Sequence, residues 1–279
     1  MAKRRYGFDE AKVSRFLKEG RGQGSGRAYQ PWLTIQDVSS HGRSTRIHSR
    51  KTQREHHLLS DNETAVFLML DWSDKVTDIR EQFPLDRDLT RRIAAEMGVV
   101  HPVDPHTRID IVMTTDFLID LDDATEKKMI ARSVKPYGEL EDKRTLEKQE
   151  IERRYWEVKG VDWALIIDID LPVQRIKNLR WLHELQSLEH MVSSYQGYWE
   201  DRCTRFLACI SQANTMSMKQ FIRYMESSQG FAAGEVITTL RHLAANKVIS
   251  MDLDARFDIN SSIDAIHVNS TTSSLRRTA

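Results

Sequence analysis

The pattern of apolar and polar positions divides the chain into a mixed first part and a mainly helical second part. In the first part, stretches with the period of amphipathic helices alternate with short runs rich in Val, Ile, Thr and Phe, which are typical of strands. The pattern predicts helices over residues 8–19, 61–70, 88–97 and 144–158. It predicts strands over residues 32–38, 45–58, 76–85, 109–121, 129–135 and 163–169. This order predicts a mixed α/β domain that ends near residue 170.

The pattern changes after Pro172, where helical periodicity dominates. It predicts helices over residues 174–188, 197–211, 216–227 and 233–246, and strands over residues 248–257 and 259–268. Helices followed by a two-stranded ribbon are typical of a winged helix, whose DNA-binding version would place Thr238, Arg241 or His242 in the major groove. Because this helix has few basic residues and the ribbon is acidic, we expect protein contact or a scaffold role rather than base readout.

Candidate chemistry lies in a predicted hairpin between the strands over residues 109–121 and 129–135, which an acidic turn connects. Asp116 lies in the middle of the first strand, where an unpaired carboxylate would be costly, and Lys135 ends the second. Glu63 lies upstream in the first turn of a helix, where alone it would be interpreted as a capping acid. Two carboxylates and a main-chain carbonyl can hold Mg²⁺, and a lysine beside them can donate to developing negative charge.

Composition changes this picture through the distribution of charge. The chain has 41 Lys and Arg and 41 Asp and Glu, but residues 1–60 hold 13 Lys or Arg against 5 Asp or Glu. This excess predicts a surface that faces a polyanion or a solvated basic face. Cys203 and Cys209 form neither a disulfide framework nor a zinc signature, so buried thiols in a reducing cytoplasm are expected. The sequence shows no signal peptide and no apolar run of membrane-spanning length, so no membrane partner is expected.

Two other motifs have a weaker link to chemistry. Residues 20–26, GRGQGSG, could cradle phosphate, but they lack the ending of a P-loop and no strand precedes them. A mobile basic loop near DNA is the more plausible interpretation. His56 and His57 would point to opposite faces of a strand, so they are expected to be solvated or to face phosphate rather than to share a metal ion.

Seven stretches are long and specific, namely KEGRGQG (18–24), PWLTIQDV (31–38), HHLLSDNETAVFL (56–68), DIREQFPL (78–85), TTDFLID (114–120), SVKP (133–136) and RTLEKQEIERRYW (144–156). Together they resemble the TnsA family, the endonuclease subunit of heteromeric Tns-type bacterial transposons. The resemblance implies a restriction-endonuclease-like catalytic domain of the PD-(D/E)XK group over residues 1–171 and a winged-helix-like domain over residues 172–268. Residues 269–279 are predicted to be a disordered tail.

The resemblance also implies the residues of the site. Glu63 and Asp116 match the metal carboxylates of the family, Lys135 its catalytic lysine, and the carbonyl of Val134 a backbone metal ligand. Mg²⁺ is the expected cofactor, with Mn²⁺ able to replace it. Ser133 departs from the pattern, because Asp, Glu or Gln is expected there and serine is an uncharged, poorer metal ligand.

Three further positions belong to the same comparison. Thr115 replaces the proline of the motif name, a substitution that the group tolerates. Glu152 or Gln149, on the helix over residues 144–158, could support the site, but solvated helix positions are the favoured interpretation.

The function that the resemblance implies is cleavage of the 5′ ends of a transposon during cut-and-paste transposition in the bacterial cytoplasm. The implied partners are transposon-end DNA, a TnsB-like transposase and a TnsC-like AAA+ ATPase regulator. The main alternative is a non-catalytic adaptor, in which a nuclease fold only bridges DNA and a partner. A purely structural role, with Asp116 as a satisfied buried acid, comes third. Metal-dependent cleavage in the presence of the transposase would separate an enzyme from an adaptor.

Overall fold

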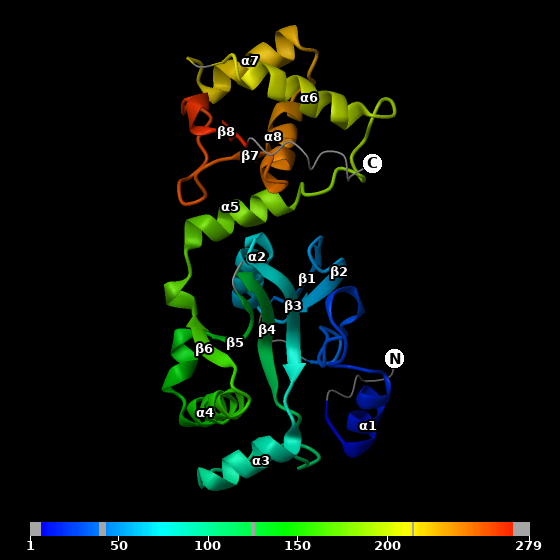
Figure 1. Cartoon of the computed structure of the whole chain (residues 1–279), viewed down its shortest axis with the longest axis vertical. Coiled ribbons are helices and arrows are strands. Elements are labelled where there is room, and N and C mark those ends of the chain that lie inside the picture. The colour runs from blue at the N-terminus through cyan, green and yellow to red at the C-terminus, as the bar shows by residue number, and fades with distance from the viewer. Residues whose placement is uncertain (1–6, 39–42, 124–125, 214, 270–279) are drawn as a thin grey trace. The chain divides into compact units, whose positions relative to one another are not determined.

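The computed structural model describes residues 7–38, 43–123, 126–213 and 215–269 (Figure 1). These residues form two compact units, one up to Leu171 and the other from Pro172. Of the predicted tail over residues 269–279, only Asn269 lies within the described part, and its main-chain N–H donates to the carbonyl of Val248 at 2.9 Å. None of the helices described is long and apolar enough to cross a membrane.

A four-stranded mixed sheet forms the centre of the first unit, in the order β3-β4-β5-β6 (Figure 1). Its strands are β3 (Val76–Pro84), β4 (Thr114–Asp123), β5 (Glu126–Lys135) and β6 (Asp162–Ile167). The pairs β3–β4 and β4–β5 are antiparallel, whereas β6 runs parallel to β5. A parallel pair needs a long crossover connection, and helix α4 (Lys143–Val158) lies within it. The predicted mixed α/β character of this unit is confirmed.

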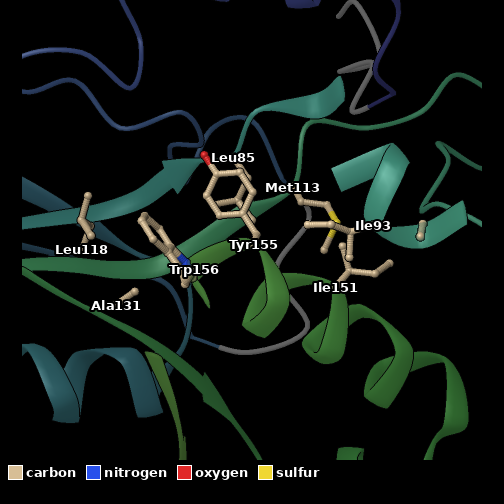
Figure 2. Packing of buried hydrophobic residues seen from close by; sticks show 9 residues of the cluster. Leu85, Ile93, Met113, Leu118, Ala131, Ile151, Tyr155 and Trp156 are labelled. Carbon is tan, nitrogen blue, oxygen red and sulfur yellow. The ribbon is translucent and has the colours of Figure 1, made fainter. Parts of the chain in front are cut away.

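Strand β4 sends apolar side chains into both faces of the sheet, because successive residues of a strand point to opposite sides. Phe117 and Ile119 pack on one face with residues of helix α2 (Asp61–Trp72). Leu118 packs on the other face with residues of α4 and of helix α3 (Arg87–Glu96). Figure 2 shows this second cluster, to which Leu85, Ile93, Met113, Ala131, Ile151, Tyr155 and Trp156 belong. Helices therefore cover both faces of the strand that carries Asp116.

A smaller group of elements precedes the sheet. Helix α1 (Glu10–Lys18) begins after Asp9, which caps it because its Oδ1 accepts the main-chain N–H of Lys12 at 2.7 Å. Strands β1 (Thr45–Ser49) and β2 (Arg54–Leu58) form an antiparallel hairpin. Short 3₁₀ helices lie elsewhere in the chain at η1 (Gly26–Ala28), η2 (Tyr137–Glu141), η3 (Asp168–Asp170) and η4 (Ile263–Ala265).

Three strand predictions in the first unit are wrong, wholly for residues 32–38 and in part for residues 45–58 and 109–121. Residues 45–58 form the hairpin of β1 and β2 rather than one strand. Residues 32–38 form turns, because the carboxylate of Asp37 accepts both the main-chain N–H of Thr34 at 3.0 Å and its hydroxyl at 2.6 Å. The strand predicted over residues 109–121 starts only at Thr114, and the residues before it belong to a loop. In that loop the N–H of Asp104 donates to the carbonyl of Ile109 at 2.8 Å.

The second unit is mainly helical, as predicted. Its elements are α5 (Val173–His183), α6 (Tyr198–Ile210), α7 (Met218–Ser228), α8 (Glu235–Ala245), β7 (Ile249–Ser250) and β8 (His267–Val268). Phe206 of α6 packs edge-on against Phe221 of α7, with ring centroids 5.4 Å apart. Cys203 is buried, Cys209 is half-buried, and both thiols are free.

The ribbon predicted at the end of this unit is much shorter than expected. Strands β7 and β8 contain two residues each, where strands over residues 248–257 and 259–268 were expected. Asp252 accepts the main-chain N–H of Asp254 at 2.8 Å, and Asp258 accepts that of Asn260 at 2.9 Å. Such local turns compete with strand pairing, which explains the short ribbon.

Two of the three positions named for base readout, Arg241 and His242, are engaged within this unit. The guanidinium of Arg241 donates to the carbonyl of Trp181 at 2.9 Å and to the carboxylate of Glu184 at 2.6 Å. A ring nitrogen of His242 lies 2.9 Å from the carbonyl of Leu185. These contacts hold both side chains within the second unit.

Candidate active site

The first turn of α2 holds Glu63 in a buried position, with 7% of the residue exposed. Ser60 caps this helix, because its Oγ accepts the main-chain N–H of Glu63 at 3.1 Å. The Glu63 carboxylate accepts the main-chain N–H of Leu59 at 3.0 Å and the Ser60 hydroxyl at 3.0 Å. Each carboxylate oxygen therefore has one donor from the chain segment just before the helix, and this fixes the direction of the side chain.

Strands β4 and β5 bring the other predicted residues together. Phe117 pairs with Arg132 across the two strands, which places Asp116 next to the last residues of β5. Asp116 Oδ2 accepts the main-chain N–H of Val134 at 2.7 Å and the ammonium of Lys135 at 3.2 Å. The same ammonium donates to the carbonyl of Val134 at 3.0 Å. A carboxylate, a main-chain carbonyl and a lysine thus meet at the end of β5.

Gln82 of β3 connects the two carboxylates, and sequence reasoning did not find it. Its Nε2 lies 3.4 Å from Glu63 Oε2 and 3.4 Å from Asp116 Oδ1. Its Oε1 accepts the hydroxyl of Thr114 at 3.0 Å. The signal available in the sequence was a glutamine within a strand opposite the candidate aspartate, which is too common a pattern to single out.

The site has more buried acidic side chains than basic ones. Burial and then the nearby Asp116 raise the pKa of Glu63 to about 7. Burial acts to lower the pKa of Lys135, but the carboxylates of Asp116, Glu152 and Glu63 outweigh it and raise that pKa well above its usual range. Lys135 therefore remains an ammonium, while Glu63 would lose its proton more readily if another cation were present.

The donor atoms fit a hard divalent cation. Carboxylate oxygens of Glu63 and Asp116 and the carbonyl of Val134 are the ligand type that Mg²⁺ prefers, and Mg²⁺ is usually bound through only one or two carboxylates while keeping several waters. No group of three or more His, Cys, Asp or Glu side chains in the described part of the chain could hold a metal ion. A cation at this site would therefore depend on two carboxylates, one main-chain oxygen and water.

Comparisons with known proteins identify relatives of this chain. The family model described as "TnsA-like endonuclease N terminal" matches residues 73–168, and the one described as "TnsA endonuclease C terminal" matches residues 170–253. The chain is 39% identical over 264 residues to "Transposon Tn7 transposition protein TnsA" of Escherichia coli, and the match covers 95% of this chain and 94% of that protein. The chain belongs to the TnsA endonuclease family. The predicted function class, an endonuclease subunit of a heteromeric transposase, is confirmed by this membership.

Within this TnsA family member, Glu152 is the clearest departure from prediction. It was expected to be a solvated helix position, but only 2% of it is exposed, and Gln149 is also buried. The carboxylate of Glu152 accepts hydrogen bonds from the hydroxyl of Ser133 and, at 3.1 Å, from the indole N–H of Trp163. Burial and the nearby Asp116 raise the pKa of Glu152 to about 7. The solvated interpretation fails because α4 packs on the sheet and turns this residue inward.

Thr115, which replaces the proline of the motif, also makes a buried hydrogen bond to a residue of helix α4. Its hydroxyl accepts the indole N–H of Trp156 at 2.6 Å, and the residue is fully buried. Ser133 therefore connects β5 to Glu152, which also accepts from Trp163. Thr115 connects β4 to Trp156 through its hydroxyl, a hydrogen bond that a proline side chain could not make.

Glycine-rich residues 20–26 lie against strand β3 and form no phosphate cradle. The main-chain N–H of Gly26 donates to the carboxylate of Asp78 at 3.0 Å. A Cβ added to Gly22 would lie 2.1 Å from Cγ of Pro84. These contacts hold the segment against Asp78 and Pro84 of β3, where a mobile basic loop was expected.

His56 also differs from the expectation of a solvated or phosphate-facing residue, because it is fully buried. Its Nδ1 lies 2.8 Å from a carboxylate oxygen of Glu81, and its Nε2 lies 2.7 Å from the Thr52 hydroxyl. Arg54 makes two hydrogen bonds to the same carboxylate. Burial acts to raise the pKa of Glu81, but hydrogen bonds and charges of Arg54 and His56 outweigh this effect and lower the pKa to about 2.

Proposed function

We propose that this chain is the subunit that hydrolyses DNA at the 5′ ends of a transposon, with Mg²⁺ as its cofactor. Glu63, Asp116 and the carbonyl of Val134 would hold the cation, and Mn²⁺ would replace it. The observation that carries the proposal is the convergence of the buried carboxyl groups of Glu63 and Asp116 and the carbonyl of Val134 around Gln82 and Lys135. The cation would act in cleavage by activating a water and stabilising the leaving oxygen.

Each residue would have a separate task in the reaction. Asp116 has one oxygen engaged by the main chain and Lys135, which leaves its other oxygen facing Glu63 and Gln82. Lys135 stays positively charged and would donate to the attacking water or to the phosphate as negative charge develops. Glu63 would release its proton when the cation binds, because the added charge offsets the repulsion by Asp116.

We further propose that the first unit is a restriction-endonuclease-like domain and that the second is a winged-helix-like domain used mainly for protein contact. The engaged Arg241 and the acidic turns of the ribbon support a partner-binding role for the second unit. DNA at the transposon ends, a TnsB-like transposase and a TnsC-like AAA+ ATPase are the partners that we propose, in the bacterial cytoplasm.

The test is cleavage of transposon-end DNA in Mg²⁺ by the chain together with both partner proteins. Asp116→Ala and Glu63→Ala should each lower 5′-strand cleavage by at least about a hundredfold, because each removes charge from the cation site. Asp122→Ala, which changes an exposed aspartate of the same strand, is the matched control and should keep full activity.

Circular dichroism should show that every variant is folded. Cleavage at the normal rate by folded Asp116→Ala protein would contradict the proposed site. Cleavage that is absent from the wild-type assembly in Mg²⁺ and in Mn²⁺ would instead favour the adaptor.

A further inference from the structure

Gln82 has a backbone conformation that non-glycine residues avoid. Its φ is 47°, in the left-handed region, although it lies inside strand β3 and is buried. The residues on either side keep their register with β4, since Glu81 pairs with Phe117 and Phe83 pairs with Thr115. A strained residue between two regularly paired neighbours persists only when its surroundings hold it there, and such residues cluster at functional sites.

The surroundings hold Gln82 from both sides along β3. The carbonyl of Gln82 accepts the main-chain N–H of Trp32 at 3.2 Å. On one side, the hydroxyl of Tyr29 donates to the carbonyl of Glu81 at 3.0 Å. On the other side, Gly22 packs against the ring of Pro84, with no room for a side chain between them. The glycine-rich segment and the residues after it therefore stabilise the strained conformation of β3 at this point.

The result is a defined orientation of the Gln82 amide. Its oxygen accepts the Thr114 hydroxyl, and its nitrogen lies at the same distance, 3.4 Å, from Glu63 Oε2 and Asp116 Oδ1. Because the amide oxygen accepts the Thr114 hydroxyl, the NH₂ group is the part of the side chain that faces the two acids. The side chain thus places two N–H donors between the carboxyl groups of Glu63 and Asp116.

We propose that Gln82 is a positioning residue of the cation site, a role that rests on the proposed function. Its amide contacts both Glu63 and Asp116 and keeps the two carboxyl groups directed to one point before a cation arrives. The two contacts are long for N–H···O hydrogen bonds, so the carboxylate oxygens keep lone pairs available for a cation. A site arranged in advance binds its ligand more tightly, because less order is lost on binding.

The test measures Mn²⁺ binding to the full chain without DNA, by titration calorimetry. Gln82→Leu removes the amide at similar volume, and Gln82→Gly removes both the amide and the backbone strain. Both should bind Mn²⁺ about tenfold more weakly, which is typical when a residue that orients metal ligands is lost. Gln53→Leu is the matched control, because Gln53 has a φ of 54° in an exposed turn and should leave the affinity unchanged.

Comparing the urea stability of the Gln82 variants with their Mn²⁺ affinity shows whether Gln82 positions the carboxyl groups or only stabilises the fold. Glycine tolerates the left-handed conformation, so Gln82→Gly should unfold at a urea concentration no lower than Gln82→Leu does, yet should lose Mn²⁺ affinity to the same extent. If Gln82→Gly binds Mn²⁺ as tightly as wild type or more tightly while Asp116→Ala loses binding, the role proposed for Gln82 is overturned but the cation site is not. Wild-type binding by Asp116→Ala would overturn the proposed cation site and with it this inference.

Discussion

At the scale of single residues, two buried glutamates have the most unusual environment in the first unit. Burial and the charge of Asp116 raise the pKa values of Glu63 and Glu152 to about 7, from an ordinary value of 4.5. Between these pH values the folded chain binds more protons than the unfolded chain does. Without a bound cation, the free energy of unfolding should therefore fall as the pH rises from about 4.5 to above 7.

Glu152→Gln tests this dependence on one residue. Glutamine keeps an oxygen for the Ser133 hydroxyl and the Trp163 indole but never ionises. The variant should match wild type near pH 4.5 and exceed its free energy of unfolding by about 3 kcal/mol at pH 8. Urea denaturation of the metal-free chain at several pH values measures the difference.

Glu157→Gln, at an exposed position of the same helix, is the matched control and should keep the wild-type pH dependence. Equal stability of Glu152→Gln and wild type at pH 8 would show that Glu152 releases its proton at an ordinary pH in the folded chain.

At the scale of elements, strand β3 depends on the glycine-rich segment that lies against it. Gly22 and Gly20 both have a left-handed φ, of 76° and 75°. Only Gly22 touches the strand, because a Cβ there would meet Pro84, whereas one at Gly20 would meet nothing within 4 Å. Gly22 is therefore required both for its left-handed backbone and for close packing on Pro84, whereas Gly20 is required only for its left-handed backbone.

Gly22→Ala should lower the free energy of unfolding by about 3 kcal/mol, through the contact with the proline ring and the left-handed backbone. Gly20→Ala should lower it by only about 1 kcal/mol, from the backbone alone. The urea midpoint of each full-length variant measures the change. Equal losses at the two positions would show that Pro84 moves aside easily and that the segment does not hold β3.

At the scale of the whole molecule, the basic excess of the first 60 residues is smaller at the surface than in the sequence. Arg54 is buried and pairs at 2.5 Å with Glu81, which lies outside the first 60 residues. Non-specific DNA affinity depends mainly on free positive charge, so this ion pair reduces it. The engaged Arg241 of the second unit adds no clear base-reading group.

The chain alone should consequently cut transposon-end DNA in Mg²⁺ at least about a hundredfold more slowly than it does with both partner proteins. Mixing the purified chain with end DNA, with each partner separately and with both, measures this dependence. The Asp116→Ala variant in the complete mixture gives the background. Efficient, site-specific cutting by the chain alone would contradict the prediction.

The sequence by itself determined the order of elements, the α/β class of the first unit and the identity of the acids and the lysine that meet at the end of β5. These follow from local signals, since hydrophobic periodicity and capping residues act within a few positions, as at Ser60 and Asp9. A family resemblance in the motifs around Glu63, Asp116 and Lys135 then added their expected roles.

Only the tertiary structure decided what surrounds those residues. Glu152 has the sequence context of an exposed helix position, and packing of α4 on the sheet is what buries it. Gln82 reaches the two carboxylates because residues about 50 positions earlier hold its strand in a strained conformation. Contacts between segments far apart in the chain leave no periodic signal in either segment, so burial, pKa and side-chain direction at these positions follow from the fold.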